Sequence, residues 1–282
     1  MIGVRCRSQE MALLLAAVVF TGASCARGRD SAQTAGSEPS SKQHEPQIVK
    51  LDVGGRPIEI VFQPVSVNSG VSAGKLCFIS TTEVTWDLYD DFIYGLANEA
   101  ELARFAADAI ARPSKPYVPP DRGFGHAGYP AISMSARGAS EFCRWLSVRT
   151  GRKFRLPTVD EWQRACLSGI STRYFFGDDP AQLGDYAWYW DNSDDQTHAV
   201  AQKKPNKLGL YDMHGNAAEW CVAGDGTFVA CGGSFRDDPP DLEVGRVKKP
   251  TPAWNAKDPQ IPKSQWWLTD APFVGFRVVM DP

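Results

Sequence analysis

The sequence lacks three features that would each point to a particular class of protein. Its 282 residues carry a net charge of −3, so there is no basic excess of the kind that binds nucleic acid. It has no Cys-x-x-Cys pair and no cysteine–histidine spacing typical of zinc sites, which argues against structural zinc. The apolar run Met11–Thr21 is too short to cross a bilayer as a helix. With 43% hydrophobic residues, the chain is long and apolar enough for one sizeable core.

The N-terminus is typical of an export signal. Two arginines precede the apolar run, and small residues then lead to a cysteine in Gly22–Cys25. This resembles a bacterial lipoprotein box, so residues 1–24 are predicted to be removed and Cys25 to carry the lipid. Ordinary cleavage near Ala26, which would give a soluble secreted product, is the alternative. Either outcome predicts an exported protein: a periplasmic or outer-membrane lipoprotein held only by its anchor, or a secreted protein.

Residues 25–47 are predicted to be a disordered tether. From position 27 onward they contain no aliphatic residue larger than alanine and are rich in Ser, Glu, Gln and Pro. Residues 48–282 are predicted to form one domain.

Regular structure is predicted mainly in the first half of this domain. The residue pattern predicts a hairpin over 48–62 that turns at Gly54-Gly55, a strand at Lys75–Ser80, helices that begin at Thr85, Ser135 and Thr158, irregular helical character over 97–111, and a closing strand at Val274–Met280. From Gly169 to the closing strand we expect loops and short strands. Periodicity alone therefore predicts a loop-rich α+β fold.

One polar, glycine-rich string is too specific for a generic loop. Residues Gly209–Glu219 read GLYDMHGNAAE, and Gly232–Phe235 follow as GGSF. Together with Thr82–Thr85 (TEVT), Arg155–Thr158 (RLPT) and Gly275–Arg277 (GFR), they resemble the formylglycine-generating enzyme family, also called sulfatase-modifying factors. The resemblance covers residues 48–281 and implies a C-type-lectin-like α+β fold with few short strands and about three helices.

The resemblance implies a calcium site in this string. Its ligands would be the carboxylates of Asp212 and Glu219 and the backbone carbonyls of Gly215 and Ala217, all hard oxygens on a tight turn. The alternative is that the two carboxylates only bond backbone amides. A second cation loop of the family would fall in the acidic stretch 191–195, which also suits a solvated loop.

The chemistry of the family is missing from the chain. Its enzymes oxidise a substrate cysteine with O₂ through two cysteines that hold copper, and thiolates suit Cu(I) because both partners are soft. The matching positions here hold Asp237 and Leu242. We therefore expect no copper-dependent oxidase reaction.

Other redox chemistry finds little support in the sequence. Cys221 and Cys231 flank a predicted hairpin and form either a disulfide or two buried free thiols, and a substitute copper site from them is weakly supported. Iron would need His126, His198 and His214 to converge. We therefore expect neither copper nor iron as a cofactor.

Two surfaces are candidate binding sites. The groove that receives a peptide in the family would be lined here by Arg236, Asp237, Asp238 and Arg246, unless these form a solvated loop. Three tryptophans in the proline-rich segment 250–272 suit partner binding, or alternatively replace a core that regular elements would supply: Trp254, Trp266 and Trp267.

The sequence therefore predicts a non-catalytic, exported member of the family that binds a protein, peptide or glycan partner at the cell envelope, with calcium stabilising the domain. The alternative is a metal-dependent oxidase, of formylglycine-generating or non-haem iron type, that acts on a thiol, a peptide or a small metabolite. A structural subunit of an envelope assembly is a third hypothesis.

Overall fold

The computed structural model describes residues 44–67, 75–94, 120–266 and 268–282. They belong to one compact unit, Gln43–Pro282. The predicted signal sequence, the lipidation site at Cys25, most of the tether and the helical character expected over 97–111 lie outside these residues. Among the described helices, none combines the length and apolar character needed to span a bilayer.

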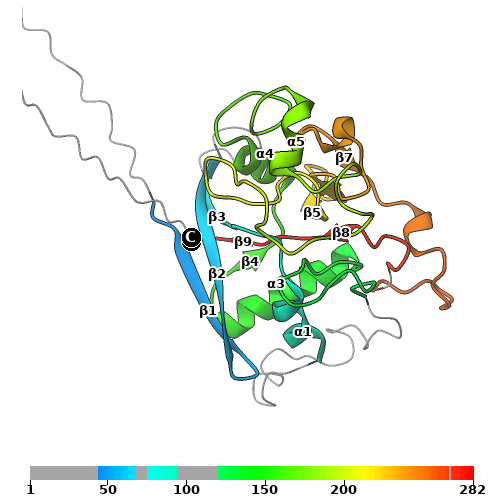
Figure 1. The fold of residues 1–282 in the computed structure, drawn as a ribbon. Coiled ribbons are helices and arrows are strands. Elements are labelled where there is room, and N and C mark those ends of the chain that lie inside the picture. Colours follow the sequence, from blue (N-terminus) through cyan, green and yellow to red (C-terminus); the bar gives the residue numbers. More distant parts are fainter. Residues whose placement is uncertain (1–43, 68–74, 95–119, 267) are drawn as a thin grey trace, which may run out of the picture. The chain divides into compact units, whose positions relative to one another are not determined.

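A five-stranded sheet carries the N-terminal and C-terminal strands of this unit (Figure 1). Its order is β1-β2-β3-β9-β4, and every neighbouring pair is antiparallel. The predicted hairpin turns at Gly54 and Gly55, which both have positive φ. The strands are β1 (Gln47–Val53), β2 (Arg56–Val67), β3 (Lys75–Ser80), β4 (Phe154–Arg155) and β9 (Val279–Met280).

A four-stranded sheet lies beyond it, in the order β7-β6-β5-β8. Its strands are β5 (Ala218–Val222), β6 (Phe228–Cys231), β7 (Val247–Lys248) and β8 (Val274–Gly275). The predicted strand 274–280 is therefore divided between two sheets. Phe276 and Val278 lie between β8 and β9 and belong to neither strand. Their carbonyls accept hydrogen bonds from the amides of Val84 and Ser80.

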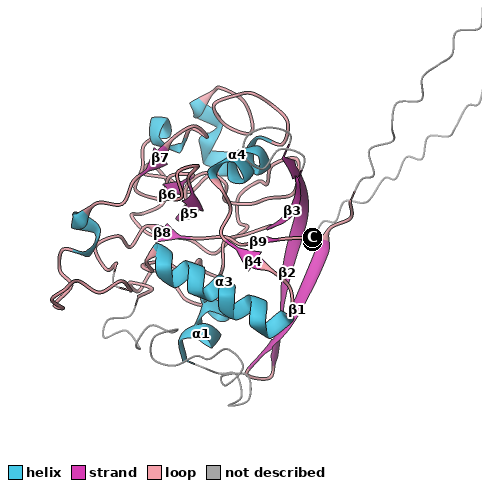
Figure 2. Ribbon diagram, turned by 180° about the vertical axis from the view of Figure 1, so that it is seen from behind, coloured by secondary structure: helices cyan, strands magenta, loops and turns pink. Residues whose placement is uncertain are grey.

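Three longer helices follow the predicted starts (Figure 2): α1 (Trp86–Tyr94), α3 (Ala136–Thr150) and α4 (Val159–Leu167). Ser135 caps α3, and Gly151 ends it with φ 71°. The Thr158–Glu161 capping box of α4 is formed as predicted. Between Gly169 and β8, the helical elements are single turns: α5 (Leu183–Tyr186), η1 (Pro180–Gln182), η2 (Pro239–Leu242) and η3 (Pro252–Asn255).

Because the domain has few regular elements, large aromatic side chains fill much of its core. Trp86, Trp162 and Trp220 are almost fully buried. Trp254 is half-buried and packs on Trp220, with ring centroids 5.8 Å apart. This tryptophan therefore extends the core, which is the second of the two roles considered for the Trp-rich segment; Trp267 lies outside the described residues.

Candidate functional site

The GLYDMHGNAAE string forms a tight turn that leads into β5. Asp212 and Asn216 have left-handed φ angles of 54° and 53°. A Cβ on Gly215 would lie 2.0 Å from the carbonyl oxygen of Trp188, so glycine is required at this close approach. The turn therefore holds the four predicted calcium ligands on one short stretch of fixed backbone.

Glu219 is fully buried and is bonded through both carboxylate oxygens. Arg277 donates Nε to Oε2 and Nη2 to Oε1, each at 2.6 Å, and Trp162 donates Nε1 to Oε2 at 2.6 Å. The same guanidinium donates to the carbonyls of Ser80 and Tyr211. Glu219 is thus the partner of a buried arginine, a geometry that satisfies both charges.

Asp212 and Glu83 complete a cluster of buried acids around Arg277. Asp212 accepts from the Ala201 amide through Oδ2 at 2.7 Å, while its buried Oδ1 has no hydrogen-bond partner. Burial, with the charges of Asp212 and Glu219, raises the pKa of Glu83 well above its usual range. Burial also raises the pKa of Asp212 to about 6. These two carboxyls therefore hold protons more tightly than exposed carboxyls do.

In this arrangement one of the two predicted calcium carboxylates, Asp212, has a free oxygen and the other, Glu219, is fully bonded. Ca²⁺ takes about six to eight oxygen ligands. Within the ranges that the structure describes, no three His, Cys, Asp or Glu side chains are grouped so as to hold a metal. Calcium binding stays a prediction, and Glu219 would have to leave Arg277 to take part.

The two positions that the resemblance matches to the family's catalytic cysteines hold residues with structural roles. Asp237 is 8% exposed; its Oδ2 accepts from the amide and hydroxyl of Ser234 at 2.7 and 2.9 Å, and Lys248 pairs with its Oδ1. Leu242 is fully buried and packs in a small apolar cluster with Tyr174 and Leu183. One position closes a turn and the other fills the core, so neither presents a reactive group.

The predicted peptide groove is a set of local ion pairs. Arg236 pairs with Asp195 at 3.0 Å, and Arg246 lies 3.8 Å from Glu243. Asp238 stands at the start of η2 without a capping hydrogen bond from its side chain. None of these four residues lines either of two cavities that lie along α3.

The acidic stretch 191–195 is also held by protein contacts. Asn192 accepts from the Tyr189 amide at 2.9 Å and donates to the Ala187 carbonyl at 3.0 Å. Asp195 is the partner of Arg236. A second cation site here stays a prediction.

Of the two states considered for Cys221 and Cys231, the structure has the free thiols. Cys221 and Cys231 are fully buried on diagonal positions of the β5–β6 ladder, and the disulfide is absent. Burial, with the hydrogen bond from Cys231, raises the pKa of the Cys221 thiol well above its ordinary value. A thiol whose pKa is raised in this way is a poor nucleophile.

The three histidines occupy separate environments. His214 is buried and accepts from the Phe175 amide at 3.2 Å. His198 stacks on Trp188 with centroids 3.8 Å apart, and His126 bonds two aspartates through its two ring nitrogens. They do not converge on a common iron site.

Sequence reasoning missed Glu83 and Arg277 as members of the buried cluster. Both stand in strings that carried the family resemblance, TEVT and GFR, but a buried ion pair leaves no periodic signal.

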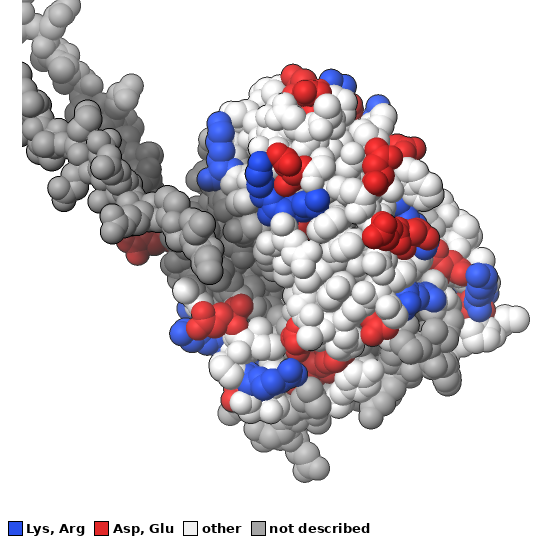
Figure 3. Space-filling view, in the orientation of Figure 1, with Lys and Arg blue, Asp and Glu red and all other residues white. Residues whose placement is uncertain are grey.

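On the face shown in Figure 3, Lys and Arg side chains are interspersed with Asp and Glu.

Comparisons with known proteins agree with these motifs. Residues 37–282 match the model of the sulfatase-modifying factor enzyme 1-like domain. The formylglycine-generating enzyme of Streptomyces coelicolor is 29% identical over 109 residues, 34% of this chain and 33% of that protein. The chaperone protein LppX of Paenibacillus barcinonensis is 35% identical over 85 residues, 24% of this chain and 30% of that protein. The chain thus spans a third or less of these curated relatives.

Solved structures show the same fold. Treponema denticola variable protein 1 aligns with a TM-score of 0.58 at 21% identity, covering 83% of this chain and 99% of that chain. PvdO from Pseudomonas aeruginosa aligns with a TM-score of 0.53 at 20% identity, covering 79% and 94%. At such identities the likeness shows the fold alone, and it confirms the predicted C-type-lectin-like α+β architecture. Because the family model covers most of the chain, the protein belongs to the family of sulfatase-modifying factor enzyme 1-like domains.

Proposed function

We propose that this chain is a non-catalytic, exported member of its family that binds a protein, peptide or glycan partner at the cell envelope. The proposal rests on the structural roles of Asp237 and Leu242, which stand at the positions matched to the family's catalytic cysteines. The first is bonded to Ser234 and Lys248, and the second is a core residue. A soft copper pair has no ligands at these positions.

Placement at the envelope is supported by the N-terminal sequence. A predicted lipid on Cys25 and a tether over residues 25–47 would hold the domain at a distance from the membrane while leaving its surface free. A domain displayed in this way suits binding better than turnover of a soluble metabolite.

Oxygen uptake tests the proposal directly. The purified full chain is supplied with Cu(I) and a cysteine-containing peptide, and O₂ consumption is followed against a protein-free control. We expect the two traces to coincide. Consumption that depends on the protein and is abolished by Cys221→Ser or Cys231→Ser would instead support the oxidase hypothesis.

A further inference from the structure

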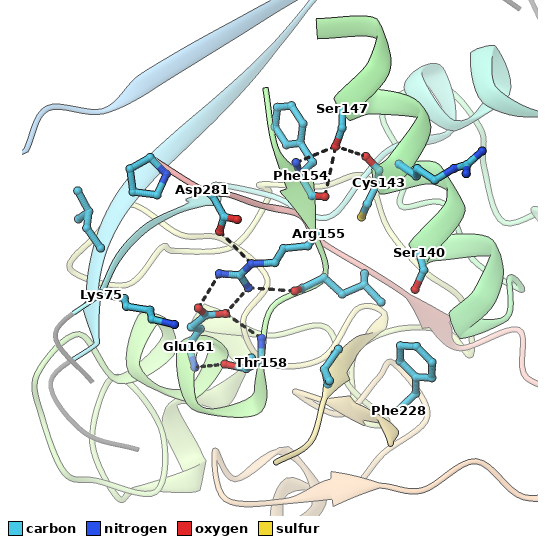
Figure 4. Close-up of a pocket in the computed structure, with 15 residues that line it drawn as sticks. Lys75, Ser140, Cys143, Ser147, Phe154, Arg155, Thr158, Glu161, Phe228 and Asp281 are labelled. Atoms are coloured by element: carbon cyan, nitrogen blue, oxygen red, sulfur yellow. Dashed lines mark hydrogen bonds and ion pairs between the residues drawn. The ribbon is translucent and has the colours of Figure 1, made fainter. Parts of the chain in front are cut away.

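Two adjoining cavities form a groove along α3, away from the residues of the predicted family groove. Their volumes are about 800 and 760 Å³, and they share Ser140 and Phe228 in their linings. The first is shown in Figure 4, where the Arg155 guanidinium lies at the centre, between Glu161 and Asp281. We call the joined cavities the α3 groove.

The walls of the α3 groove are largely apolar, and one wall carries small side chains. The face of α3 that lines it presents small side chains one and two turns apart: Ala136, Ser140, Cys143 and Ser147. The opposite wall is the β5–β6 hairpin, through Val222 and Phe228. Small residues on one wall and apolar side chains on the other leave room for inserted side chains of a ligand.

The charges that line the α3 groove are unevenly compensated. Glu161 and Asp281 are both engaged by Arg155, and Glu141 is 3.3 Å from Arg144. Asp225 accepts hydrogen bonds from Thr227.

Three exposed cations of the lining have no acidic partner within ion-pair distance among the residues that the structure describes: Lys75, Arg137 and Lys249. Arg137 lies over the Trp266 ring instead, at 5.2 Å. The two linings together hold five cations and four acids, so any preference for a negatively charged ligand comes from the three cations that face solvent.

We propose that the α3 groove binds a linear segment of a partner protein in which apolar residues alternate with Asp or Glu. The apolar side chains fill the cavities on either side of Ser140, and the carboxylates meet Lys75, Arg137 and Lys249. The inference rests on the proposed binding function and deepens it, because it places recognition on α3 rather than on the face where the family carries its chemistry.

Peptide pools test this proposal on the full chain. One pool of short fluorescein-labelled peptides alternates Leu or Phe with Asp or Glu; a matched pool carries Lys or Arg in place of the acids. Fluorescence anisotropy measures the affinity of each. We expect the acidic pool to bind more tightly, and its binding to weaken at least about tenfold when Lys75, Arg137 and Lys249 are all changed to Glu.

Two further variants make the result specific. Ser140→Trp fills the point shared by the two cavities and should abolish binding of the acidic pool without changing charge. Reversal of Lys50, Arg173 and Lys204 to Glu gives the same change of net charge outside the groove and should leave binding intact.

Three outcomes would overturn the proposal: equal binding of both pools, an equal loss of binding in the Lys50, Arg173 and Lys204 variant, or a dimer in light scattering that Ser140→Trp dissociates. The oxygen-uptake result does not depend on any of them, so failure of the groove and failure of the proposed function are distinguishable.

Discussion

At the scale of single residues, Arg277 and Glu219 form a fully buried ion pair. They are joined by two hydrogen bonds of 2.6 Å. Removal of one partner leaves an uncompensated charge in the core. We expect Arg277→Met to lower the free energy of unfolding by about 3–5 kcal/mol, measured by denaturant titration.

A surface pair provides the control for this variant. Arg236→Met breaks the exposed pair with Asp195, which should cost less than about 1 kcal/mol. Equal losses for the two variants would show that burial does not set the strength of the Arg277 pair.

Glycine at position 215 is required by space as well as by backbone angle. Gly54 and Gly215 both have positive φ, but a Cβ on Gly54 meets nothing within 4 Å, whereas a Cβ on Gly215 meets the Trp188 carbonyl. Gly54→Ala should therefore cost about 1 kcal/mol, and Gly215→Ala at least about 3 kcal/mol. Thermal unfolding of the two variants in parallel separates strain from steric overlap; matching shifts in Tm would contradict the close approach.

At the scale of elements, α4 begins at a charged capping box. Burial alone would raise the pKa of Glu161, but its bonds to Arg155 and to Thr158 hold that pKa below the ordinary value of 4.5. A lowered pKa contributes stability that is present above pH 4.5 and is lost as the pH falls through the folded pKa.

Glu161→Gln should therefore destabilise the domain at neutral pH, by about 1–2 kcal/mol, and much less at acid pH. Denaturant titrations at several pH values measure the difference from the unsubstituted chain. The control is Glu59→Gln, which alters an exposed pair with Lys50 and should show little effect at any pH. A Glu161→Gln deficit that stays constant with pH would rule out the ionic contribution.

The elements predicted from sequence are those that local chemistry specifies. Ser135, Gly151 and the Thr158–Glu161 pair mark helix ends through hydrogen bonds within a few residues, so the helix starts could be predicted. The division of Val274–Met280 between two sheets could not, because it depends on partners far away in the sequence, such as Ser80, which lies 198 residues before Val278. The Glu219–Arg277 pair was missed for a similar reason, since its two residues lie 58 positions apart.

At the scale of the whole molecule, the family resemblance was more informative than periodicity. It correctly predicted the C-type-lectin-like fold and the family, which the family model and the solved structures confirm. It could not show that Glu219 bonds Arg277, since a motif carries residue types and not their partners. The α3 groove likewise has no sequence signature, because its linings come from seven separate stretches of the chain.

The central claim is that the fold of a metal-dependent oxidase is used here without its redox metal. Elemental analysis of the purified full chain, after dialysis against metal-free buffer, tests it most directly. The account predicts copper and iron far below one equivalent per chain, and calcium at or below one equivalent. One equivalent of copper or iron per chain would contradict it, because Asp237 and Leu242 leave that metal no place to bind.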